Sequence, residues 1–116
     1  MQELVFKQKD SWRFSRAGKI AIKQVVETTA DYTGYTIEAL MGRSRVVGLA
    51  KTRLVMMFLL RKHTQLSFPQ IGKVCVRDHS TVMAACRAVL KDPRLVDLAA
   101  AIEERFVDKG GQTGYG

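Results

Sequence analysis

The sequence has 116 residues, enough for one small domain, and 47% of them are hydrophobic while 26% are charged. This composition is ordinary for a globular protein and excludes a chain that is disordered throughout. The charge balance is unusual, because 19 Lys and Arg against 11 Asp and Glu give a formal net charge of +8. A small basic domain favours a polyanionic partner, either nucleic acid or an anionic membrane surface.

The positive charge is concentrated in the middle of the chain. Residues 43–94 hold eleven Lys and Arg and two acids, a net charge of +9, and the stretches on either side of them, 24–42 and 95–116, are net acidic. Charge that serves only solubility is normally interspersed. The longest apolar run, Leu54–Leu60, has seven residues, far below the roughly 20 of a membrane span. The N-terminus also lacks the apolar stretch of a secretory signal. We therefore expect a cytoplasmic protein with no membrane partner.

Residues 1–16 are basic with interleaved aromatic residues and have no clear period, so we expect an N-terminal arm there. A helical domain is expected over residues 17–108. The last segment, 109–116, contains four glycines and is expected to be a disordered, Gly-rich tail.

Two helices are expected before residue 43. Residues 17–32 form the first, and Gly34 provides a stop signal. Its apolar stripe at helical spacing is Ile22, Val25, Val26 and Thr29. Thr36 can cap a short second helix that ends at Met41 and is closed by Gly42.

A basic loop is expected from Gly42 to Lys51, followed by a helix from about Ala50 to Thr64. The run Leu54–Leu60 is apolar on all sides, which indicates a buried central helix. The pair Met56 and Met57 is interpreted as part of its core.

Three more helix starts follow. Ser67 and Gln70 form a capping box with Pro69 in the first turn, which predicts a helix ending near Val74 or Cys75. A second starts at Asp78 and carries the stripe Val82, Ala85, Cys86 and Val89. Asp92 and Pro93 start the last helix. Strand signals are nearly absent, so the expected fold is all-α, a bundle of about five to six helices.

The helices near 67–74 and 78–90, joined by a tight turn, have helix-turn-helix spacing. In that motif the N-terminal end of the second helix enters the major groove. Arg77 can pair with guanine there, Asp78 can accept from cytosine N4, and the Thr81 methyl can pack on thymine. A simpler interpretation stays open, in which Asp78 is only an N-cap and the hydroxyl residues are only first-turn polar residues.

The segment from Arg77 to Val82, followed by Ala85-Cys86-Arg87, resembles the RDH(S/T)TV…ACR motif of the DNA-binding domain of the bacterial replication initiator DnaA. Leu66–Gly72 is similar to the first motif helix of that family, and Arg43-Ser44-Arg45 is similar to its basic loop. The resemblance extends from about Ile20 to Ile102. It implies base contacts by residues 78–81 with Arg77 beside them, a minor-groove contact by Arg43 or Arg45, and a phosphate contact by Arg53. The candidate DNA-binding residues are Arg43, Arg45, Lys51, Arg53, Arg77, Asp78, His79, Ser80 and Thr81.

The sequence departs from the family at two places. The turn at residues 73–76 has no glycine and is about one residue shorter, and the loop between Arg45 and Arg53 is about two residues longer. We therefore expect an altered site preference. A G-x-x-x-x-G-K-(S/T) phosphate loop is absent from the sequence, so we expect a DNA reader without the ATPase part, with no cofactor and no enzymatic activity.

Two other kinds of site are disfavoured. Cys75, His79 and Cys86, with His63, do not have the spacing of a structural zinc site, and the cysteines suit reduced core thiols. Adjacent Asp78-His79-Ser80 point in different directions on a helix and cannot form a catalytic relay.

The sequence thus predicts specific binding to double-stranded DNA, through a helix-turn-helix in the major groove and a basic loop in the minor groove. The expected role is regulation of replication initiation or transcription at initiator-type boxes, in a nucleoid-associated protein. Residues 1–16 are hypothesised to recruit a protein partner. The alternative is a protein-interaction module whose basic face binds an acidic partner in the replication machinery.

Overall fold

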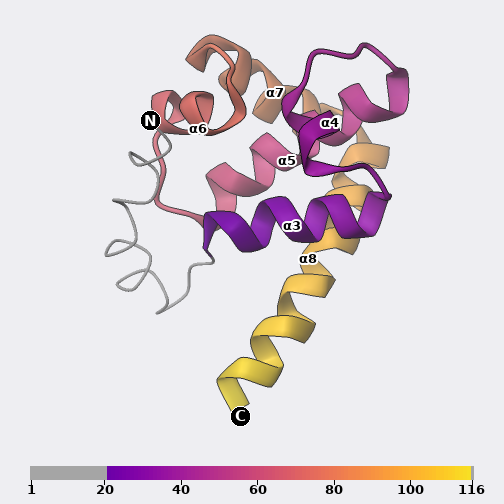
Figure 1. The fold of residues 1–116 in the computed structure, drawn as a ribbon, viewed down its shortest axis with the longest axis vertical. Coiled ribbons are helices and arrows are strands. Elements are labelled where there is room, and N and C mark those ends of the chain that lie inside the picture. Colours follow the sequence, from indigo (N-terminus) through magenta and orange to yellow (C-terminus); the bar gives the residue numbers. More distant parts are fainter. Residues whose placement is uncertain (1–20, 116) are drawn as a thin grey trace.

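The computed structural model describes the backbone of residues 21–115 and the side chains of residues 21–106. This part of the chain consists of helices joined by short connections and has no strand, so the all-α prediction is confirmed. The helices are α3 (Ile22–Thr33), α4 (Ile37–Met41), α5 (Val47–His63), α6 (Phe68–Cys75), α7 (His79–Lys91) and α8 (Pro93–Tyr115) (Figure 1). No helix among the described residues is both long enough and apolar enough to cross a membrane. The predicted arm at residues 1–16 lies outside the described residues.

Helix α5 is the centre of the fold. Every other described helix packs against it, and Figure 1 shows α3 on one side of α5 and the pair α6 and α7 on the other. Most of its apolar run is buried, as the sequence predicts, while Leu54 and Phe58 are partly buried and pack against the edge of the core. The buried members of that run are Val55, Met56, Met57, Leu59 and Leu60.

Local signals place most helix ends. Gly34 closes α3 in the left-handed conformation, with φ of 87°, and its N–H donates to the Ala30 carbonyl at 2.8 Å. The Thr36 hydroxyl caps α4 by accepting from the Ala39 N–H at 3.0 Å. Both ends are as the sequence predicts, because each depends on residues within one helical turn.

The predicted extent of the basic loop is wrong. Helix α5 begins at Val47 rather than near Ala50, so the loop is only residues 42–46 and Lys51 lies on the helix. The first two residues of the helix, Val47 and Gly48, are weak helix formers. Packing overrides that preference, because Leu49 is buried and a side chain on Gly48 would collide with the Tyr35 hydroxyl.

The turn between α6 and α7 is tight and strained. Val76 has φ of 57° and ψ of 50°, and it is the one non-glycine residue with positive φ among the described residues. A β-branched residue in this region is a genuine outlier. Gly72 permits the tight turn, since a Cβ there would collide with the Arg77 carbonyl oxygen. The turn at residues 73–76, which has no glycine, thus contains a residue whose backbone conformation favours glycine.

The final helix is held to α5 by a small polar cluster. His63 Nε2 lies 2.6 Å from Glu103 Oε2, and Lys62 Nζ lies 2.7 Å from the same oxygen. The His63 ring meets Phe106 edge to face, with centroids 5.2 Å apart. Desolvation opposes ionisation of Glu103, but the hydrogen bonds from Lys62 and His63 prevail and lower the pKa of its carboxyl.

The backbone of α8 is helical as far as Tyr115, through the Gly-rich segment where the sequence predicts disorder. The last α8 side chain described is Phe106, which is buried in the core. Disorder of the tail stays a prediction.

Replacing the strained residue tests the turn. Val76→Gly should stabilise the protein by about 1 kcal/mol, because relief of the left-handed conformation exceeds the extra chain entropy of glycine. Lys73→Gly is the matched control on the exposed side of α6, and it should destabilise by about 1 kcal/mol. Chemical denaturation measures both. A loss of stability in Val76→Gly would contradict the strained conformation.

The cluster at Glu103 predicts a pH dependence. A carboxyl with a lowered pKa stabilises the fold above its ordinary value of 4.5, and this contribution is lost as pH falls through the lowered value. Glu103→Gln should therefore cost about 1 kcal/mol near neutral pH, and the difference from the parent should vanish in acid. Exposed Glu104→Gln is the control. A difference that is independent of pH in thermal unfolding would refute the ion-pair account.

Candidate nucleic-acid interface

The N-terminal end of α7 presents exposed polar side chains. The Asp78 side chain is 67% exposed and that of His79 is 57% exposed, and Ser80 and Thr81 are exposed as well. The helix begins here because Asp78 is a good N-cap. Its Oδ2 accepts from the Ser80 N–H at 3.0 Å and also from the Ser80 hydroxyl. The hydrogen bond from the Ser80 hydroxyl lowers the pKa of Asp78 most, and the hydrogen bond from the Ser80 N–H lowers it further.

The capping and base-reading interpretations of Asp78 are compatible. Both cap hydrogen bonds use Oδ2, while Oδ1 lies 4.0 Å from His79 Nδ1 on the exposed side. An ionised carboxylate has lone pairs on both oxygens. One oxygen can therefore hold the helix start while the other accepts from a base edge.

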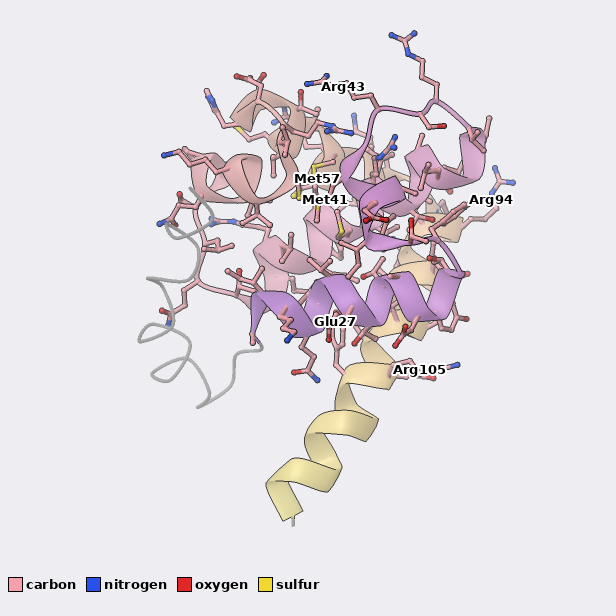
Figure 2. All side chains as sticks on the ribbon, in the orientation of Figure 1. Glu27, Met41, Arg43, Met57, Arg94 and Arg105 are labelled. Carbon is pink, nitrogen blue, oxygen red and sulfur yellow. The ribbon has the colours of Figure 1, made fainter. Side chains whose placement is uncertain are left out.

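The loop of residues 42–46 carries two exposed cations, Arg43 and Arg45. Figure 2 shows Arg43 at the edge of the molecule away from Glu27 and Arg105. Lys51, the third cation predicted for this loop, is half-buried on the second turn of α5. The loop is thus shorter and carries two cations rather than three.

Arg53 is largely buried and bonded within the protein. The residue is only 7% exposed, and its guanidinium donates to three backbone carbonyls. Nε donates to Leu40 at 2.9 Å, Nη2 to Ala39 at 2.8 Å, and Nη1 to Ser44 at 2.5 Å. Burial, followed by the positive charge of Arg77, lowers the pKa of Arg53. The structure gives Arg53 an internal contact set, and its family-implied contact with phosphate stays a prediction.

Arg77 also bonds within the protein. Its Nη1 donates to the carbonyls of Cys75 at 3.1 Å and Val76 at 3.0 Å, at the end of α6. Its Nη2 donates to the Gly42 carbonyl at 2.5 Å. This last bond joins the turn before α7 directly to the start of the basic loop. The two candidate DNA-binding elements are therefore neighbours in space.

No ion pair within residues 21–106 neutralises the arginines of this face. The pairs in that part of the chain lie elsewhere, apart from the contact between Asp78 and His79. The charges of Arg43, Arg45, Arg53 and Arg77 are therefore not neutralised by an ion pair with a described acid. Such a face attracts a polyanion.

The geometry of the described residues also argues against a zinc site and a catalytic relay. Cys75 is a buried free thiol, and desolvation raises its pKa to about 12, so it is a poor ligand and nucleophile. His63 is bonded to Glu103 on the α8 side of α5. The Ser80 hydroxyl donates to Asp78 rather than to His79, which is the wrong arrangement for a relay.

The internal roles of Arg53 and Arg77 are what the sequence reasoning missed. A signal for Arg53 was present, since it lies on α5 four residues after Leu49 and three before Met56, both buried. A cation on a buried helix face must find acceptors inside the protein. For Arg77 the sequence contains no comparable signal, because Gly42 lies 35 residues away.

The chain matches the model of the bacterial dnaA protein helix-turn-helix over residues 22–89. Three curated relatives are chromosomal replication initiator proteins. DnaA 1 of Chlamydia trachomatis is 40% identical over 84 residues, which are 69% of this chain and 18% of the relative. DnaA of Picosynechococcus is 35% identical over 87 residues, 71% of this chain and 19% of the relative. DnaA of Mycobacteroides abscessus is 39% identical over 75 residues, which are 65% of this chain and 15% of the relative. The match thus covers between 15% and 19% of the length of these relatives.

Helix order, the tight α6–α7 turn and the basic face define a helix-turn-helix module of the DNA-binding class. Within that class, the chain belongs to the bacterial DnaA helix-turn-helix family, which is matched over more than half of its residues.

Substitution of Asp78 separates its two roles. Asp78→Ala should lower the melting temperature, because the α7 cap is lost, and should also relax the sequence preference for DNA. Asp78→Asn keeps an acceptor for the cap and should melt close to the parent while preferring a different base. Asp92→Ala, which removes the cap of α8, is the control. Unchanged base preference in Asp78→Asn would mean that Asp78 is only a cap.

Proposed function

We propose that this protein binds double-stranded DNA sequence-specifically, with the start of α7 in the major groove and the loop of residues 42–46 in the adjacent minor groove. The observation that carries the proposal is the bond from Arg77 to the Gly42 carbonyl. It holds a loop with two exposed arginines beside an exposed recognition-helix end. A basic loop suits the narrow and strongly negative minor groove.

Affinity and specificity come from different residues in this proposal. Arg43, Arg45 and Lys51 meet phosphates or the minor groove and set register. Specificity is assigned to Asp78, His79, Ser80 and Thr81, whose donors, acceptors and methyl group can distinguish base edges. The expected role is regulation of replication initiation or transcription at initiator-type boxes, by a cytoplasmic, nucleoid-associated and non-catalytic protein.

A second function has one observation in its favour. Val46 and Val47, next to the arginines of the loop, are 60% and 68% exposed. Exposed apolar residues beside charge are typical of protein interfaces, so the basic face could instead bind an acidic protein of the replication machinery. The hypothesis that residues 1–16 recruit a protein partner lies outside the described residues.

Selection of bound duplexes from a random pool tests the proposal most directly. An enriched consensus is expected, and the log of its binding constant should fall with log salt at a slope of about −5 to −7, for about five to eight neutralised phosphates. Poly-glutamate serves as the acidic-protein probe. Binding of poly-glutamate without preference for any duplex would favour the alternative function.

Base reading by α7 is tested on the selected duplex. His79→Ala and Ser80→Ala should each lose about 1–3 kcal/mol at the contacted bases and little on random DNA. Lys91→Ala, at the opposite exposed end of α7, should leave the preference intact. Equal losses on specific and random duplexes would exclude base reading by this helix.

A further inference from the structure

Two guanidinium groups hold the segment that carries the basic loop. Between Ala39 and Ser44, four backbone carbonyls accept hydrogen bonds from arginine side chains. Arg53 binds those of Ala39, Leu40 and Ser44, and Arg77 binds that of Gly42. The two arginines come from α5 and from the turn before α7, so the loop is bonded to both.

The loop has few bonds of its own. Besides the bonds from Arg53 and Arg77, the Gly42 N–H donates to the Ala39 carbonyl at 3.1 Å and the Val46 carbonyl accepts from the Ala50 N–H of α5 at 2.8 Å. The Val46 N–H donates to the Ser44 hydroxyl at 3.3 Å. Residues 43–46 are exposed and pack little. The conformation of the loop therefore depends on the arginine side chains that bond to its carbonyls.

This arrangement needs arginine rather than any cation. A guanidinium presents five N–H donors in a rigid plane, whereas an ammonium is a single point with flexible donors. Arg53 uses donors on all three of its nitrogens toward three different carbonyls. Lysine at this position would keep the positive charge and lose the fixed geometry.

We propose that Arg53 and Arg77 are positioning residues, which set the placement of the minor-groove loop relative to the recognition helix. This inference rests on the proposed function, and it differs from a direct phosphate contact by Arg53. Recognition elements act only when held close to their productive geometry. Adjacent grooves of the duplex lie at a set separation, so a loop displaced from α7 cannot enter the minor groove while α7 stays in the major groove.

A double-mutant cycle tests the proposal for Arg53. On the selected duplex, Arg53→Lys should weaken binding by about tenfold, although the charge is kept. In a background with Arg43→Ala and Arg45→Ala, Arg53→Lys should have no further effect, because Arg53 acts through the loop. A full additional loss in that background would overturn the proposal in favour of a direct contact.

Protection of each DNA groove by the bound protein can be measured separately. A loss of protein stability would not change one groove and spare the other. In Arg53→Lys, protection of the minor groove should be lost while protection of major-groove guanines remains. Arg77→Lys, which breaks the bond to Gly42, should give the same pattern and serves as the second variant if Arg53→Lys does not fold. Equal loss in both grooves by a folded variant, or binding like the parent, would refute the positioning role.

Arg61→Lys is the matched control. Arg61 lies on the same helix and also donates to a backbone carbonyl, that of Leu66 at 3.1 Å, but it holds the connection between α5 and α6. Arg61→Lys should still protect both the minor and the major groove. The parent protein must protect both grooves of the selected duplex, and failure of the parent to do so would count against the proposed function rather than against the positioning role.

Discussion

The positive charge of Arg53 lies inside the protein, and the geometry of the proposed DNA-binding face depends on how that charge is satisfied. Burying a cation is costly unless it is hydrogen-bonded. Arg53 is 7% exposed, and the described residues provide no carboxylate to pair with it. Backbone carbonyls of α4 and of the following loop take that place, which requires the loop to fold back over α5. A charge in the core thus determines where the loop lies.

The turn before α7 is the second constraint on that face. Helices α6 and α7 approach so closely that only glycine fits at position 72, and Val76 adopts the left-handed conformation to close the turn. Strained backbone persists only where the surrounding structure enforces it. The side chains of Ile71 and Cys75 on α6 and of Val82 on α7 are buried. Their packing sets the direction of α7. Arg77 then links this turn to the loop.

The start of α7 contributes both to the stability of the helix and to the chemistry of the candidate interface. Asp78 caps α7 through one carboxylate oxygen and leaves the other exposed, so a residue chosen by local helix physics also lies at the candidate interface. The same helix end provides His79, Ser80 and Thr81 without further backbone elements. The candidate recognition surface is therefore built from the first turn of one helix, and it is placed by the core beneath that helix.

The sequence by itself determined the class of fold, most helix boundaries, the capping box at Ser67, the buried centre of α5 and the residues at the start of α7. These follow from spacing and capping within one or two turns, where cause and effect are close along the chain. Only the tertiary structure decided that α5 starts at Val47, that Arg53 and Arg77 bond to the loop, and that Val76 is left-handed. Those features depend on contacts between residues 9 to 35 positions apart or on the packing around one turn. No local pattern encodes such contacts, because their energy arises only when the folded elements meet.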